Sequence, residues 1–116
     1  MSLSFGSFSM RIHLHSILVL TALALGSPAY AGEHVVTQKA KAFGTKKLNA
    51  KVGDSVKFVN DDPFAHNVFS LSETKSFDLG SHGHGTSKSV LMDKAGTIEV
   101  ECAVHPDMKM TIEVGK

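Results

Sequence analysis

Apolar and polar residues alternate with a period of two through most of the chain. In residues 97–102, Ile98, Val100 and Cys102 share one face, and threonine and glutamate take the other. Residues 110–114 repeat the pattern with methionine, isoleucine and valine on one face. This period is typical of β-strands that bury one face. Clusters of Gly, Asn, Asp and Pro separate such segments about every ten residues. The pattern predicts an all-β domain.

The alternating segments predict about seven short strands, which is typical of a sandwich or a small barrel. We expect strands at residues 35–43, 48–52, 56–58, 66–71, 87–92, 97–102 and 110–114. The first is expected at a sheet edge. Residues 73–78 read as polar and irregular, and residues 80–85 as a flexible glycine-rich loop. Nothing in the sequence indicates an amphipathic helix, a heptad or an internal repeat.

The amino-terminal part predicts a targeting segment rather than part of the domain. Residues 17–26 form an apolar run preceded by Arg11, and small residues at Ala29 and Ala31 occupy the positions that a signal peptidase reads. The run is about half of the roughly 20 apolar residues that a membrane anchor requires.

We therefore interpret residues 1–31 as a cleavable signal peptide and residues 32–116 as one exported domain. Met10 remains an alternative to Met1 as the true start. The predicted location is the periplasm, without stable membrane insertion of the mature chain.

Charge excludes one class of partner. The chain has 12 basic and 11 acidic residues, which nearly cancel. No basic stripe is present, so nucleic-acid binding has no support. Blocks of like charge are also absent, so docking driven by long-range attraction is not expected.

The only cysteine, Cys102, is the first candidate for a metal ligand. One cysteine cannot form an internal disulfide in an exported domain. Cys102 lies at a predicted strand end, with His105 three positions later and Met108 three beyond it. A thiolate, an imidazole and a thioether are ligands for a soft, redox-active metal, and copper is the first candidate. A type 1 copper site needs a second imidazole, and His66, which follows a turn and opens a strand, fits best.

Other interpretations of these residues are an inert buried thiol or a zinc site using the same cysteine and histidines. A methionine as fourth ligand favours copper over zinc.

Two segments resemble the cupredoxins plastocyanin, amicyanin and pseudoazurin. FVNDDPFAHNV at residues 58–68 is similar to their first-histidine segment, and CAVHPDM at residues 102–108 is similar to the short ligand loop of amicyanin. The similarity runs in order from about Val35 to Val114. It implies a cupredoxin-like Greek-key β-sandwich of about seven or eight short strands.

The resemblance implies a ligand set. His66, Cys102 and His105 correspond to the equatorial ligands of one type 1 copper ion. Met108 corresponds to the axial ligand by the amicyanin spacing. Met110 matches a longer loop, but it is in phase with the strand core.

The resemblance also implies surrounding roles. Asn67 matches the residue that ties the two ligand loops together and whose backbone N–H points at the cysteine sulfur. Val104 stands where plastocyanin and amicyanin have proline. Its N–H is available to donate a second hydrogen bond to the thiolate, which would lower the reduction potential.

The predicted function is a periplasmic blue copper protein that carries single electrons between redox partners, not an enzyme. By resemblance, electrons pass through His105 to a cytochrome, dehydrogenase or reductase, and the carrier is a monomer. The alternative is copper delivery, storage or resistance, with His82 and His84 as an auxiliary His-x-His site. His34 is a further candidate for that site.

Overall fold

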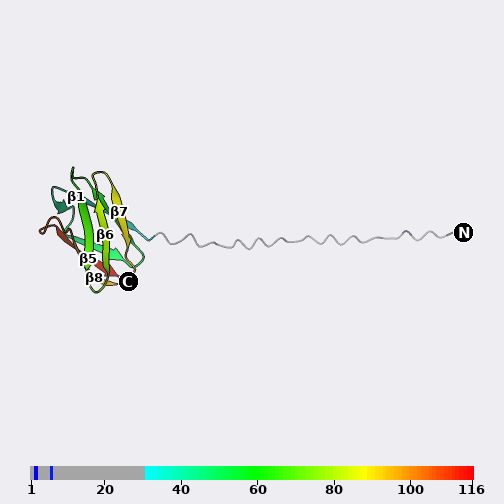
Figure 1. Cartoon of the computed structure of the whole chain (residues 1–116). Helices are drawn as coiled ribbons and strands as arrows, with labels where there is room; N and C mark the ends of the chain where they lie inside the picture. Colours follow the sequence, from blue (N-terminus) through cyan, green and yellow to red (C-terminus); the bar gives the residue numbers. More distant parts are fainter. Residues whose placement is uncertain (1, 3–5, 7–30) are drawn as a thin grey trace.

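The computed structural model describes residues 2, 6 and 31–116, and in this part it is a two-sheet β-sandwich (Figure 1). The strands are β1 (Glu33–Lys39), β2 (Ala42–Phe43), β3 (Lys47–Lys51), β4 (Ser55–Asn60), β5 (His66–Leu71), β6 (Ser76–His82), β7 (Ser87–Leu91), β8 (Gly96–Glu101) and β9 (Lys109–Gly115). The all-β prediction is confirmed, with nine strands rather than seven or eight. The predicted signal peptide lies outside the described residues, apart from residues 2, 6 and 31. Within the part that the structure describes, no helix has the length and apolarity to cross a bilayer.

The strands form two sheets. One has the order β2-β1-β4-β7 and the other β3-β9-β8-β5-β6. Two pairs are parallel, β1 with β4 and β3 with β9, and the other pairs are antiparallel. β5 and β6 lie side by side in Figure 1. One end of the sandwich, the site end, brings together the carboxyl end of β4, the start of β5 and the end of β8.

The core lies between the two sheets and follows the predicted alternation. In β9, Met110, Ile112 and Val114 are buried, and in β8, Ile98 and Val100 are fully buried. Burying a side chain of this size stabilises the fold by about 1.5–3 kcal/mol relative to leaving it exposed. These strands therefore hold the loop between them in a fixed position.

The predicted strand at residues 35–43 is broken into β1 and β2. Ala40 and Lys41 have φ angles of 53° and 59°, and together they form the turn of a tight hairpin. Neither residue type signals a left-handed turn. The turn is held by a distant side chain, because the carboxylate of Asp62 accepts the N–H of Ala40 at 2.7 Å and of Lys41 at 3.1 Å. β2 is the outer strand of its sheet, and it covers β1 only at Gln38 and Lys39, so the edge prediction fails only at these two residues.

Residues 73–85 differ most from the prediction. Ser76–His82 forms strand β6 instead of an irregular segment, and it pairs with β5. His82 is directly opposite His66 in this ladder. The segment has little alternation of its own, and its pairing with β5 makes it a strand.

Candidate metal centre

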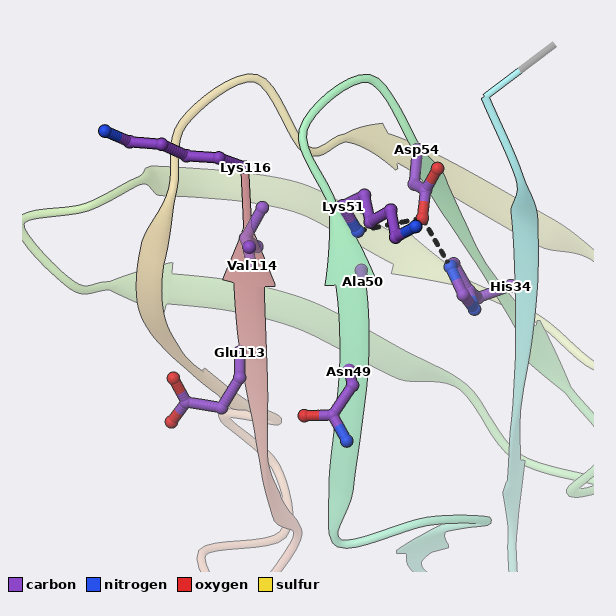
Figure 2. A pocket seen from close by; sticks show the side chains of 9 residues that line it. His34, Asn49, Ala50, Lys51, Asp54, Glu113, Val114 and Lys116 are labelled. Carbon is purple, nitrogen blue, oxygen red and sulfur yellow. Dashed lines mark hydrogen bonds and ion pairs between the residues drawn. The ribbon is translucent and has the colours of Figure 1, made fainter.

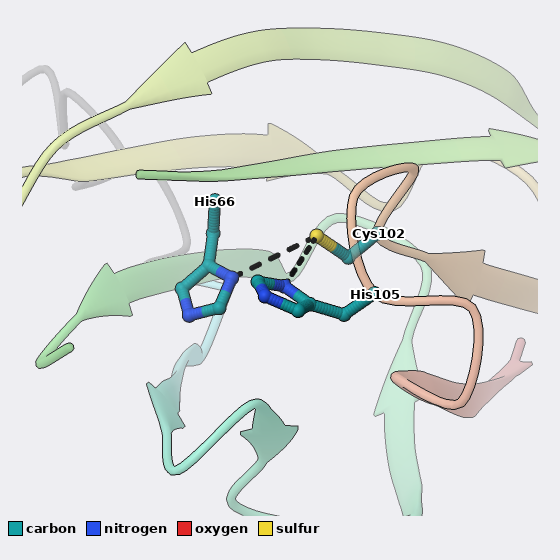
Figure 3. Close-up of side chains that lie close together, drawn as sticks. All are labelled: His66, Cys102 and His105. Carbon is teal, nitrogen blue, oxygen red and sulfur yellow. Dashed lines mark hydrogen bonds between the residues drawn. The ribbon is translucent and has the colours of Figure 1, made fainter. Parts of the chain in front are cut away.

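Three predicted ligand side chains converge at the site end. The Cys102 sulfur lies 3.7 Å from His66 Nδ1 and 3.8 Å from His105 Nδ1, and the three atoms lie within 4.8 Å of one another (Figure 3). A cation about 2.3 Å from sulfur and about 2.0 Å from nitrogen, in a trigonal plane, would separate these atoms by about 3.7 Å. The donor set and its spacing therefore fit a soft metal ion.

Three elements supply these side chains. His66 is the first residue of β5, Cys102 directly follows β8, and His105 lies in the loop before β9. The loop is closed by its own backbone, because Met108 N donates to His105 O at 2.9 Å and Cys102 N donates to Met108 O at 3.2 Å. These bonds turn His105 back towards the sulfur.

Both candidate axial methionines are buried. Met108 ends the ligand loop beside the Cys102 backbone, whereas Met110 lies in β9 opposite Val100. Met110 therefore belongs to the strand core, as its alternation predicted. The assignment of Met108 as axial ligand stays a prediction.

A carboxylate that the sequence analysis missed holds His66. His66 Nε2 lies 2.6 Å from Asp62 Oδ2, and both side chains are buried. Burial alone would raise the pKa of Asp62, but hydrogen bonds from His66 and from the Lys41 and Ala40 amides together lower it. The ionised carboxylate keeps a proton on Nε2 and leaves Nδ1 free to face the sulfur. The available signal was an acidic residue four positions before a candidate ligand.

Two asparagines join the segments around the site. Asn60 is fully buried, and its side chain donates to Phe64 O at 2.8 Å and to His82 O at 3.0 Å. Asn67 Oδ1 accepts the Ala103 N–H at 2.7 Å. This bond links the two ligand segments, as the resemblance implied for Asn67.

The sulfur environment differs from two expectations. The hydrogen bonds that the structure gives Cys102 Sγ are with the imidazoles of His66 and His105. Donation from the backbone N–H of Asn67 or of Val104 is not among them, and the Val104 side chain is exposed. The effect of Val104 on the potential stays a prediction.

His82 and His84 do not form a chelating pair. His82 is buried opposite His66, and burial together with nearby Lys88 lowers its pKa. His84 is exposed, and its Nδ1 donates to Asp62 O at 2.9 Å. The expectation of a solvated loop is therefore wrong for His82, because pairing with β5 turns it into the core.

The site reaches the surface through His105, which is half-buried. The Phe64 ring centroid lies 5.5 Å from that of His105, and Phe64 and Val104 are exposed. The Lys41 ammonium lies 5.8 Å from the Phe64 ring centroid. Exposed apolar side chains therefore lie near His105, with one cation beside Phe64.

Comparisons with known proteins agree with this geometry. The family described as "Copper binding proteins, plastocyanin/azurin family" matches residues 31–115. The methylamine utilization protein MauL of Methylorubrum extorquens is 33% identical over 109 residues, covering 90% of this chain and 96% of MauL.

Solved structures are similar as well. A Cu(I) structure of an amicyanin variant has a TM-score of 0.66 and 25% identity, covering 71% of this chain and 81% of amicyanin. A copper-containing nitrite reductase of Thermus scotoductus has a TM-score of 0.68 and 27% identity over 72% of this chain. The chain spans only 22% of that reductase.

These comparisons and the site geometry confirm the resemblance to the cupredoxins, the β-sandwich fold and copper as the cofactor. They also confirm the prediction that the protein is an electron carrier rather than an enzyme. The chain belongs to the plastocyanin/azurin family of copper-binding proteins.

Proposed function

We propose that His66, Cys102 and His105 are the equatorial ligands of one type 1 copper ion and that Met108 is the axial ligand. The observation that carries this proposal is the convergence of two imidazole Nδ1 atoms on one buried thiol, at 3.7 and 3.8 Å. The burial of Met108 at the end of the same loop supports its axial role.

Copper bound here would supply one-electron chemistry between Cu(II) and Cu(I). The chain's contribution is to hold the ligands still. Asp62 orients His66, Asn67 ties the loop of Cys102 to β5, and the backbone closes that loop at Met108. Ligands fixed in this way change little in position when the charge at the site changes.

Electrons would enter and leave through His105. The surrounding rim of Phe64 and Val104 is apolar and small, which suits brief contacts with redox proteins. The chain's net charge is near zero, so contact rather than long-range attraction selects the partner. The similarity to MauL points first to redox proteins of methylamine utilization, with a cytochrome, dehydrogenase or reductase as the class. The carrier itself would act as a monomer.

The carrier would work in the periplasm after cleavage following Ala31. The family match begins at residue 31, and β1 begins at Glu33, so cleavage there would leave the domain intact. The alternative role in copper storage loses its main support, because His82 is buried and His84 is exposed.

Adding Cu(II) to the purified exported protein tests the ligand set. We expect an intense thiolate-to-copper absorption band and an EPR spectrum with narrow copper hyperfine splitting. Cys102→Ser should lose the band, and His84→Ala, outside the site, should keep it. A colourless complex of the unaltered protein would contradict a type 1 site.

A further inference from the structure

The tripeptide Gly32-Glu33-His34 lies at the end of the sandwich away from the metal centre. β1 runs parallel to β4, with Glu33 opposite Ser55 and Gln38 opposite Asn60. Because Asn60 is at the site end, Glu33 is at the far end. Any chemistry of this tripeptide is therefore separate from that of His66, Cys102 and His105.

The carboxylate of Asp54 contacts both the first and the third residue of the tripeptide. Gly32 N donates to Asp54 Oδ1 at 2.8 Å. His34 Nε2 donates to Asp54 Oδ2 at 2.8 Å (Figure 2). The contact occupies Nε2, so Nδ1 is the ring nitrogen left for another partner. His34 and Asp54 border an open hollow of 490 Å³, also lined by Lys51 and Glu113.

We infer that removal of residues 1–31 creates a second Cu(II) site at the new amino terminus. Its donors are the Gly32 amine, the backbone nitrogens of Glu33 and His34, and His34 Nδ1. The inference rests on the proposed cleavage after Ala31 but not on the proposed electron-carrier site.

The chemistry follows from the spacing of these four nitrogens. An ion bound to the amine and the two backbone nitrogens closes two five-membered chelate rings. Binding of His34 Nδ1 together with the His34 backbone nitrogen closes a six-membered ring. Four nitrogens in a plane suit Cu(II) or Ni(II). The second residue is Glu33, which keeps a backbone N–H, whereas proline there would remove one donor. Binding releases protons from the amine and both amides to solvent, so it weakens as the pH falls.

The fold opposes this site only weakly. At this end β1 pairs with β4 alone, since β2 pairs only with Gln38 and Lys39. Binding separates Glu33 and His34 from Ser55 and Val56, their partners in β4. It also breaks the hydrogen bonds of Gly32 with Ser55 N, at 3.0 Å, and with Asp54. The net contribution of such hydrogen bonds is small, because the freed groups bond to water instead, and four nitrogen–metal bonds outweigh it. The carboxylate beside Nε2 is also the usual outer partner of a metal-binding imidazole.

The test uses the protein exported with its own leader, whose amino terminus is read by mass spectrometry. Copper(II) sulfate is then added while absorption and EPR are followed. We expect a start at Gly32 and two Cu(II) per chain. One should give the intense thiolate band, and the other a weak visible band with wide hyperfine splitting. His34→Ala should bind one Cu(II) per chain, with the thiolate band unchanged.

Glu33→Pro is the matched variant, because it keeps the amine, His34 and Asp54 and removes only one backbone donor. It should also lose the second Cu(II), while its thiolate band shows that it is folded. A start other than Gly32, a single Cu(II) in the unaltered protein, or a second Cu(II) that survives both variants would overturn the inference. Loss of the thiolate band with retention of the second Cu(II) would instead contradict the electron-carrier site alone.

Discussion

The imidazole of His66 lies between a carboxylate and a thiol. Its Nε2 is 2.6 Å from Asp62 Oδ2, and its Nδ1 is 3.7 Å from Cys102 Sγ. Asp62 is itself held by the amides of Ala40 and Lys41 in the turn between β1 and β2. The position of a proposed copper ligand thus depends on a hairpin far from it in the sequence.

This relationship predicts that Asp62→Asn raises the reduction potential. The asparagine oxygen can still accept from Nε2, but the side chain loses the acceptor of the Ala40 N–H and the negative charge that favours Cu(II) over Cu(I). Changes in such outer partners typically cost about 10–100-fold in metal affinity. If that loss falls on Cu(II), the potential rises by about 60–120 mV, at about 59 mV per tenfold for one electron. Voltammetry of the copper-loaded protein measures it.

Asp61→Asn is the control for this charge. Asp61 is the exposed neighbour of Asp62 and carries the same charge. Its substitution should move the potential much less. Equal shifts in the two variants would show that the buried contact has no special effect.

The two methionines should respond differently to substitution. Met108→Leu should change the visible spectrum and raise the potential, because a weak axial ligand is lost. Met110→Leu should leave both unchanged and lower the free energy of unfolding by less than about 1.5 kcal/mol, as volume-conserving core changes do. Absorption, voltammetry and chemical denaturation separate the two effects. The opposite pattern would make Met110 the ligand.

The hydrogen bond between the Asn67 side chain and Ala103 should stabilise the fold as well as the ligand loop. Asn67→Ala removes the acceptor of the Ala103 N–H, so the metal-free protein should lose about 0.5–1.5 kcal/mol of unfolding free energy. Asn67→Asp keeps an acceptor oxygen and should retain most of it. Urea denaturation of the metal-free variants measures the difference. If both variants lose the same amount, the link to Ala103 is not what stabilises the loop.

Gly96 is predicted to be a position that only glycine fits. Its φ is 137°, and an added Cβ would lie 2.6 Å from Thr74 Oγ1 and 2.9 Å from Thr74 Cγ2. Gly96→Ala should therefore lower the unfolding free energy by more than about 1 kcal/mol. A Gly96→Ala/Thr74→Ala double variant should recover part of the loss.

Gly83→Ala provides the comparison, because nothing lies within 4 Å of the added Cβ there. It should be close to neutral in the same denaturation experiment. A similar loss at both glycines would mean that steric contact with Thr74 does not matter.

The sequence alone determined the strands around the site and the identity of its donors. Ile98, Val100 and Cys102 alternate strictly, and the short spacing from Cys102 to His105 keeps two donors in one loop. Such signals are local, so they can be read without knowing the fold.

Only the tertiary structure decided which distant groups meet these donors. Asp62 reaches His66 because the left-handed turn at Ala40 and Lys41 binds the same carboxylate. His82 becomes a buried strand residue because β6 pairs with β5. Neither effect is visible in the alternation of apolar and polar residues along the sequence. Each depends on contacts between distant segments, whose relative positions are set by the packing of the two sheets.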